Sequence, residues 1–187
     1  MINDQEETMN HSQLHLAAFA DICQIKALTL HSHQEKYAGT GENLAAQALN
    51  KNNQLFIITC NKHIIGGFYL DFAKQLYQKE INKNSSCCTL RAMIIDKRHQ
   101  GKGLAQAALA KLQPLTHCYF PVLESIGLTV NCKNSAAKKV YLGCGFEDTK
   151  KRYYGGNAGP QAIYTLFLKS HQPCQSQHIL ASHNNEP

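Results

Sequence analysis

The segment with the clearest chemical potential is a glycine-containing turn in the middle of the chain. An apolar run ending in Met93-Ile-Ile is followed by a polar stretch and by Gln100-Gly-Lys-Gly103-Leu-Ala105, where a helix is predicted to begin. Glycines let the backbone approach a ligand closely because no Cβ intervenes. Free N–H groups in the first turn of a helix, with the helix dipole, attract anions. The segment therefore predicts a cradle for phosphate or pyrophosphate, although an ordinary tight turn would also use glycine.

Two common nucleotide-binding motifs do not fit this turn. A P-loop needs Lys and then Ser or Thr after its last glycine, whereas Leu104 follows Gly103 here. The dinucleotide fingerprint needs a third Gly or Ala at position 106, which is Gln. The pattern Q/R-x-x-G-x-G/A is satisfied by residues 100–105.

A second patterned segment follows a predicted strand further along the chain. Asn134-Ser-Ala-Ala137-Lys-Lys-Val-Tyr141-Leu-Gly-Cys-Gly145-Phe146 has the form N-x-x-A-x-x-x-Y-x-x-x-G-F. Together the two segments resemble the GCN5-related N-acetyltransferase (GNAT) superfamily, over about residues 15–168. A narrower set of segments is similar to small bacterial acetyltransferases: Leu90-Arg-Ala, His99-Gln-Gly-Lys-Gly, Leu128-Thr-Val-Asn-Cys, Cys144-Gly-Phe-Glu-Asp-Thr and Gly155-Gly-Asn-Ala-Gly-Pro-Gln.

The resemblance implies an α/β (α+β) fold. Its central sheet is mixed and mostly antiparallel, has about six to seven strands splayed in a V, and carries helices on both faces. Acetyl-CoA, the implied cosubstrate, would lie where the strand ending at Ile95 separates from the strand Ser125–Val130. Lys102 and Lys138 could meet its phosphates. The cofactor-binding residues implied in this way are Met93, Ile94, Ile95, Gln100, Gly101, Lys102, Gly103, Leu104, Ala105, Asn134 and Ala137.

The implied chemistry is attack of a neutral amine on a thioester carbonyl. The oxyanion needs a preorganised donor, for which we expect a backbone N–H at the end of the Met93–Ile95 strand. Tyr141 stands where the family places the phenol that protonates the leaving thiolate, although a tyrosine there could simply be a core residue. An ammonium substrate must also lose a proton. The candidate bases are Glu35, Glu42, Asp71 and Glu124, each of which could equally be a solvated carboxylate.

The acceptor is less well defined by the sequence. Residues expected near it are Gln34, Glu35, Tyr37, Thr89, Arg91 and Gln161. The segment Gln34-Glu-Lys-Tyr37 resembles polyamine acetyltransferases, but the positive net charge argues against a strongly cationic acceptor. Arg91 could hold an acceptor carboxylate or form a structural ion pair. We expect a small-molecule amine; the alternatives are a protein N-terminus or lysine, an aminoacyl-tRNA, or a CoA-binding module without turnover.

The pattern of apolar residues predicts the elements that position these groups. Helical spacing predicts helices over His15–Leu30, Glu42–Leu49, Gly103–Leu112 (ended by Pro114) and Ser135–Leu142 (capped by Asn134). The predicted strands are Leu55–Thr59, Ile64–Phe72, Cys88–Ile95, Ser125–Val130, Lys150–Tyr154 and Ala162–Leu168. We expect loops at Lys79–Ser86 and Gly155–Pro160.

Composition narrows the class of protein. The 187 residues are 43% hydrophobic and 17% charged, which is typical of one globular domain, and the net charge is +6. We expect a flexible N-terminus over 1–14, a domain over 15–169 and a disordered tail over 170–187. Eight cysteines without a CxxC pair, and no secretory signal, predict free thiols in the cytoplasm. No metal-binding motif, membrane span or nucleic-acid signature is apparent, and we expect a monomer or homodimer.

Overall fold

The computed structural model describes residues 12–73, 86–155 and 159–169. Its centre is a seven-stranded sheet in the order β1-β2-β3-β4-β5-β7-β6. The strands are β1 (Gln13–Leu16), β2 (Asn53–Cys60), β3 (His63–Asp71), β4 (Cys87–Ile95), β5 (Ser125–Asn131), β6 (Glu147–Tyr153) and β7 (Gln161–Phe167). Only the β4–β5 pair is parallel among the described strands. The mixed, mostly antiparallel sheet predicted from the sequence is confirmed.

The β2–β3 hairpin is formed by a local turn. Asn61 and Lys62 have φ angles of 49° and 66°, which a two-residue turn of the type favoured between twisted strands requires. Further along β3, Gly66 lies so close to β4 that a Cβ would approach the Ile94 carbonyl oxygen to 2.3 Å. The hairpin can therefore pack directly against the strand that carries the predicted site.

Helices cover both faces of the sheet. One face packs against α5 (Leu104–Leu109), α6 (Leu112–Tyr119) and α7 (Ser135–Gly143) around a core that includes Phe56, Phe68 and Ile126. The other face packs against α1 (Ile22–Lys26) and α3 (Gly41–Ala46) through Ile25 and Leu44. Helix α2 (Ser32–Ala38) lies beside β4, and short 3-10 turns occur at η1 (Phe19–Asp21), η2 (Gln47–Leu49) and η3 (Lys97–His99).

The predicted helix over His15–Leu30 is wrong in its first half. Gln13–Leu16 forms β1, which pairs with Phe56–Thr59 at the edge of the sheet. Phe19, which lies within the predicted helix, is 92% exposed. Pairing with β2 buries Leu14 and satisfies the backbone of β1, and this tertiary gain outweighs the local helical pattern. The strand also includes Gln13 and Leu14, which we had assigned to the flexible N-terminus.

The predicted end of the Gly103–Leu112 helix is also wrong. The chain makes a break after Leu109, and α6 then begins at Leu112 with Pro114 in its first turn. A proline is tolerated there because the first N–H groups of a helix have no intrahelical partner. The expected loop Lys79–Ser86 and the tail from residue 170 lie almost wholly outside the described residues, as do 1–11 and 156–158.

Candidate active site

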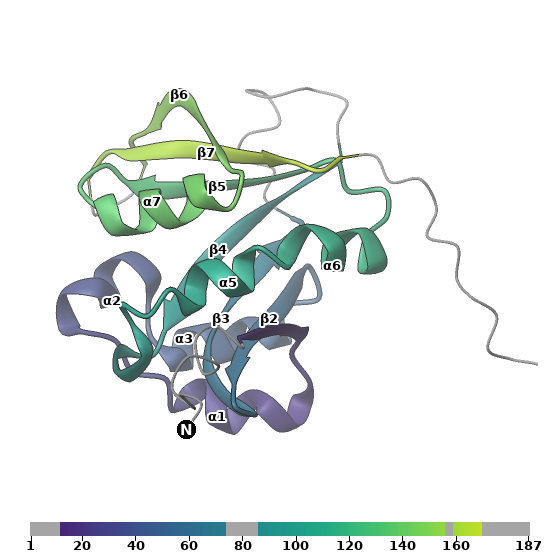
Figure 1. Ribbon diagram of the computed structural model, residues 1–187, viewed down its shortest axis with the longest axis vertical. Helices are drawn as coiled ribbons and strands as arrows, with labels where there is room; N and C mark the ends of the chain where they lie inside the picture. The colour runs from purple at the N-terminus through teal and green to yellow at the C-terminus, as the bar shows by residue number, and fades with distance from the viewer. Residues whose placement is uncertain (1–11, 74–85, 156–158, 170–187) are drawn as a thin grey trace, which may run out of the picture.

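The sheet opens between its two parallel strands. β4 and β5 pair only at Cys87–Ser125, Cys88–Ile126 and Thr89–Gly127, whereas β5 continues alongside β7 as far as Asn131. Beyond Thr89, the described residues provide no strand to cover that edge of β4. Figure 1 shows β4 and β5 diverging from this point, with α7 on the side of β5 and α2 on the side of β4. The exposed edge can accept an extended ligand as an added strand.

A distortion in β4 lies inside this opening. The register against β3 shifts between Gly67 and Tyr69, and Ala92 has a φ angle of 53°. A non-glycine residue in the left-handed region is uncommon and marks strain that the surrounding structure maintains. A bulge re-aims the groups that flank it. Here it changes the direction of the backbone between Arg91 and Met93, where the strand faces the opening.

The glycine-containing turn follows directly after β4. Gly101 and Gly103 have φ angles of 75° and 73°, a region that side chains other than glycine rarely adopt. Within the described part of the chain, no hydrogen bond engages the main-chain N–H groups of residues 100–105. All of these residues except Lys102 border a groove of about 370 Å³ between the N-terminus of α5 and α7. A run of unpaired amides beside a groove is suited to an anionic ligand.

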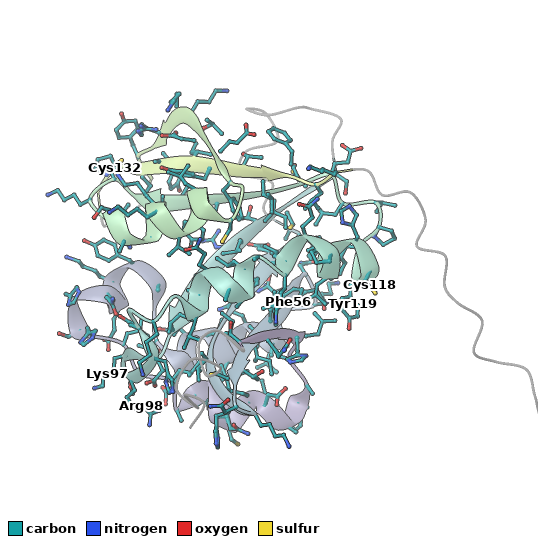
Figure 2. All side chains as sticks on the ribbon, in the orientation of Figure 1. Phe56, Lys97, Arg98, Cys118, Tyr119 and Cys132 are labelled. Atoms are coloured by element: carbon teal, nitrogen blue, oxygen red, sulfur yellow. The ribbon has the colours of Figure 1, made fainter. Side chains whose placement is uncertain are left out.

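Asp96 anchors the start of this turn. Its carboxylate is fully buried and accepts hydrogen bonds from the Thr29 N–H and hydroxyl and from the backbone and side chain of Arg98. Burial by itself would raise the pKa of Asp96, but the hydrogen bonds from Arg98 and Thr29 outweigh burial and hold that pKa well below its usual range. Figure 2 places Arg98 and Lys97 at the outer side of the turn.

A pair of glutamines connects this turn to α2. The Gln34 Nε2 donates to Gln100 Oε1 at 3.0 Å, and the Gln100 Nε2 donates to Gln34 Oε1 at 2.9 Å. Gln100 also donates to the Ile95 carbonyl at 2.8 Å. Each amide thus uses both its donor and its acceptor. The pair therefore holds the turn and α2 at a fixed distance from each other.

The groove continues into a larger cleft of about 550 Å³ between α2, β4, β5 and α7. Tyr141, on α7, lines this cleft although only 7% of it is exposed. Its ring meets Phe146 edge-on at 5.6 Å. Burial, with a smaller contribution from Cys144, raises the pKa of Tyr141 well above its ordinary value. The group is therefore a phenol, able to donate a proton, throughout the physiological range.

Most of the predicted site residues are brought together here. Those bordering the groove are Met93, Ile95, Gln100, Gly101, Gly103, Leu104, Ala105, Asn134 and Ala137. Ile94 instead points its side chain into the core, so only its backbone could serve a ligand. Lys102 borders a different hollow, and Lys138 donates to the Cys132 carbonyl at 2.8 Å. Asn134 uses its Oδ1 to cap α7 at Ala137 N–H, which leaves its amide N–H groups for a ligand.

None of the four candidate bases belongs to the described residues that line the cleft. Glu35 and Glu42 line a separate hollow on the other side of α2. Asp71 is paired with Arg91, and its Oδ2 lies 3.8 Å from the Nη1 of that arginine. Glu124 precedes β5, at the end where β4 and β5 are still paired. Among the described residues, no carboxylate therefore lines the cleft where it could take a proton from a bound amine.

The cleft also contains residues that the sequence did not single out. Lys36 and Tyr153 line it, together with the expected Tyr37, Arg91 and Gln161. A helical pattern places Lys36 beside Tyr37, but only the β6–β7 pairing brings Tyr153 to the same cleft. Among the described residues, no three His, Cys, Asp or Glu side chains are grouped as metal ligands would be.

The comparisons with known proteins agree with this geometry. The family model described as an acetyltransferase (GNAT) domain matches residues 11–157. The chain belongs to the GNAT acetyltransferase family. The predicted family is thereby confirmed, and the GNAT domain extends over the sheet from β1 to β6.

A relative and two solved structures resemble this GNAT protein. The N-acetyltransferase YbbJ of Bacillus subtilis (strain 168), which its description calls uncharacterized, is 26% identical over 145 residues, covering 78% of this chain and 90% of the relative. An AAC(6')-Ib structure with paromomycin and acetyl-CoA has a TM-score of 0.67 at 18% identity, covering 89% of this chain and 99% of that one. A Vibrio cholerae spermidine N-acetyltransferase with CoA and spermine has a TM-score of 0.60 at 19% identity, covering 84% and 95%.

These likenesses establish an N-acetyltransferase with the α/β fold expected from the sequence. The two structures are named as complexes with CoA or acetyl-CoA. In the described ranges, no helix has the length and apolar character needed to cross a membrane.

Proposed function

We propose that this protein transfers the acetyl group of acetyl-CoA to the primary amine of a small molecule, by direct attack within a ternary complex. The observation that carries the proposal is the continuity of the groove and the cleft. The groove presents the unpaired amides of residues 100–105, and the cleft presents the buried phenol of Tyr141. The structural neighbours support a small amine, since they include a spermidine acetyltransferase and an aminoglycoside acetyltransferase.

The chain's own residues fit acetyl-CoA in the following way. The amides of residues 100–105 bind the pyrophosphate, and the open edge of β4 at Met93–Ile95 pairs with the pantetheine. The amide nitrogen of Asn134, and the small side chain of Ala137, face the same groove. Acetyl-CoA supplies the activated acyl group. Lys138 donates to the Cys132 carbonyl and Lys102 lines a different hollow, so neither of these two side chains lines the groove.

The residues around Ala92 and Tyr141 then serve the transfer. A backbone N–H at the bulge stabilises the oxyanion as the amine nitrogen bonds to the carbonyl carbon. The carbon–sulfur bond breaks, and the sulfur leaves with the electron pair. Tyr141 donates its proton to that sulfur, which leaves a tyrosinate. The nitrogen loses one proton, which passes through water to the tyrosinate and restores the phenol, since no carboxylate lines the cleft among the described residues.

We also propose that the protein acts in the cytoplasm. All seven cysteines that the structure describes are free thiols, which suits a reducing compartment. A monomer or a homodimer remains our expectation, because both the groove and the cleft are built from one copy of the chain.

The test combines acetyl-CoA binding with thiol release. A ligand that binds only the native state raises the melting midpoint by mass action. We expect acetyl-CoA to raise it and Gly103→Glu to abolish the rise, because a side chain at φ 73° is strained and crowds the amides. Gly159→Glu is the matched control, since Gly159 also has a positive φ (90°) but does not border the groove.

Turnover is measured as thiol release with a panel of small amines. Tyr141→Phe should lower kcat by about 100-fold or more, the contribution of a positioned proton donor. Tyr164→Phe removes the hydroxyl of another buried tyrosine, on β7 and outside the cleft, and should leave the rate unchanged. A midpoint shift without release from any amine would favour a CoA-binding module or a macromolecular acceptor. No shift at saturating acetyl-CoA would refute the proposal.

A further inference from the structure

The charges around the acceptor part of the cleft have one sign. Among the described residues that line it, Lys36 and Arg91 are the only charged side chains. The other polar groups, such as Thr89, Asn131 and Gln161, are neutral. A cleft that holds a polycation needs carboxylates to offset its charge, and none is present in this lining.

Arg91 is placed to bind an anion. It lies on β4 directly before the bulge, and its side chain is 35% exposed toward the cleft. Its Nη1 is 3.8 Å from the Asp71 carboxylate, which is beyond hydrogen-bond distance. Asp71 therefore orients the guanidinium and offsets part of its charge. The planar fork of N–H groups can still bind a carboxylate or phosphate through two hydrogen bonds.

Lys36 adds a second positive charge at the rim. It lies on α2, and its ammonium is 4.9 Å from the centre of the Tyr37 ring. Both side chains line the cleft, so this contact holds the lysine beside the entrance. An exposed cation at that place attracts anionic molecules and repels cationic ones, with an effect that salt screens.

The acidic residues described on the neighbouring elements lie outside the lining of the cleft. Glu35 and Glu42 line the hollow on the far side of α2, close to Lys26. Asp148, on β6, is paired with Lys150 at 3.9 Å and with Arg152 at 3.3 Å. Asp71 does not line the cleft, and it is paired with Arg91.

From this arrangement we infer that the acceptor is a primary amine that also carries an anionic group, a carboxylate or a phosphate, bound by Arg91. The inference rests on the proposed function and separates this protein from acetyltransferases of polyamines and aminoglycosides. The cleft of about 550 Å³ is large enough for a molecule of amino-acid size together with the acetyl end of the cosubstrate.

The test compares amines that differ only in the anionic group. Thiol release is measured with β-alanine against β-alaninamide, with O-phosphoethanolamine against ethanolamine, and with spermidine as a polycation. The two anionic amines distinguish a carboxylate from a phosphate acceptor. We expect at least one anionic member to exceed its partner without the anionic group about tenfold or more in kcat/KM, because hydrogen bonds to a charged group are worth that much. The amine of β-alaninamide is the less basic one, so a preference for β-alanine does not reflect a larger supply of neutral amine.

The variants assign the preference to the two cations. Arg91→Gln should lower the kcat/KM ratio of the anionic amine to its partner about tenfold. The KM for acetyl-CoA should stay within about twofold of its original value. Arg91→Lys, which keeps the charge without the fork, should fall between, and it also covers the case in which Arg91→Gln folds poorly beside Asp71. Lys36→Gln should weaken the preference mainly at low salt. Lys51→Gln, an exposed lysine away from the cleft, is the matched control and should change nothing.

The results also separate this inference from the proposed function. Thiol release with spermidine, β-alaninamide or ethanolamine that equals or exceeds release with the anionic amines would overturn the inference and leave the acetyltransferase proposal intact. An equal loss for all amines in Arg91→Gln would overturn it as well, because it would show a structural role. Failure of every amine to release thiol, although acetyl-CoA raises the melting midpoint, would contradict transfer to a small amine itself.

Discussion

Replacement of Asp96 by asparagine tests how firmly the cofactor turn is anchored. The carboxylate joins the end of β4 to Thr29, in the segment that leads into α2, and to Arg98 within the turn. Asparagine has almost the same shape, so the substitution changes charge and hydrogen bonding while leaving the packing nearly unchanged. We expect a loss of stability and weaker binding of acetyl-CoA.

The magnitude follows from the five hydrogen bonds that the carboxylate accepts. If the asparagine oxygen takes the position of Oδ2, three bonds remain. Its NH₂ group then faces the Arg98 N–H and Nε–H, which lie 3.0 Å and 2.7 Å from Oδ1. Two charge-assisted bonds are lost and donors face donors. Because the Arg98 side chain is 70% exposed, water recovers part of the loss, and we expect about 2–3 kcal/mol in the free energy of unfolding.

The measurement is urea unfolding of both proteins at pH 7, 5 and 3. The folded pKa of Asp96 is lowered, so its contribution to stability is present above the unfolded value of about 3.9 and is lost as the pH falls through the folded pKa. The difference between the two proteins should be constant from pH 7 to 5 and smaller at pH 3. Asp21→Asn is the control: Asp21 accepts one exposed N–H, from Ala18, and should cost under about 1 kcal/mol.

A difference within about 0.5 kcal/mol at pH 7, the usual range for an ordinary surface substitution, would refute this reasoning. So would a large difference that does not decrease at pH 3, because the loss would then come from packing rather than from the ionised carboxylate.

Three further predictions concern the strand, the glutamine pair and the phenol. Gly66→Ala places a Cβ 2.3 Å from the Ile94 carbonyl oxygen and should lower stability by about 2 kcal/mol or more in urea unfolding. A loss under about 0.5 kcal/mol would show that β3 can move. Gln34→Leu removes both amide bonds to Gln100 and should raise the KM for acetyl-CoA about threefold to tenfold with the melting midpoint nearly unchanged; an unchanged KM would contradict the coupling. Because burial raises the pKa of Tyr141, the rate should not fall through ionisation of this phenol up to about pH 10. A decline below that pH that disappears in Tyr141→Phe would contradict the assignment.

The sequence predicts well those elements whose signals are local. The strands of the β2–β3 hairpin are predicted by the β-rich runs Leu55–Thr59 and Ile64–Phe72, and α7 is predicted by its cap at Asn134. The glycine turn was placed correctly because glycine at a positive φ between a strand and a helix is itself a local signal. The fold follows from these elements together with the family motifs.

Features that depend on distant contacts could not be predicted in this way. β1 forms because its backbone pairs with the edge of strand β2, and this pairing cannot be predicted from the local pattern of residues 15–30. The Gln34–Gln100 pair joins residues far apart in the chain. Ala92 gives no sign in its residue type that it adopts a positive φ. The sequence also offered four carboxylates as equivalent bases, and only the fold places all four outside the described lining of the cleft.

The opening between β4 and β5 has a consequence for how such a protein can change over time. The edge of β4 and the amides of residues 100–105 present backbone groups, which are the same for every amino acid apart from proline. Side chains along this stretch can be exchanged while the shared ligand keeps its contacts. The cleft proposed for the acceptor, in contrast, is lined by side chains such as Lys36 and Arg91. A few substitutions in that lining could therefore change the chemical preference. The AAC(6')-Ib and spermidine acetyltransferase structures each share under one fifth of their aligned residues with this chain and still have the same fold.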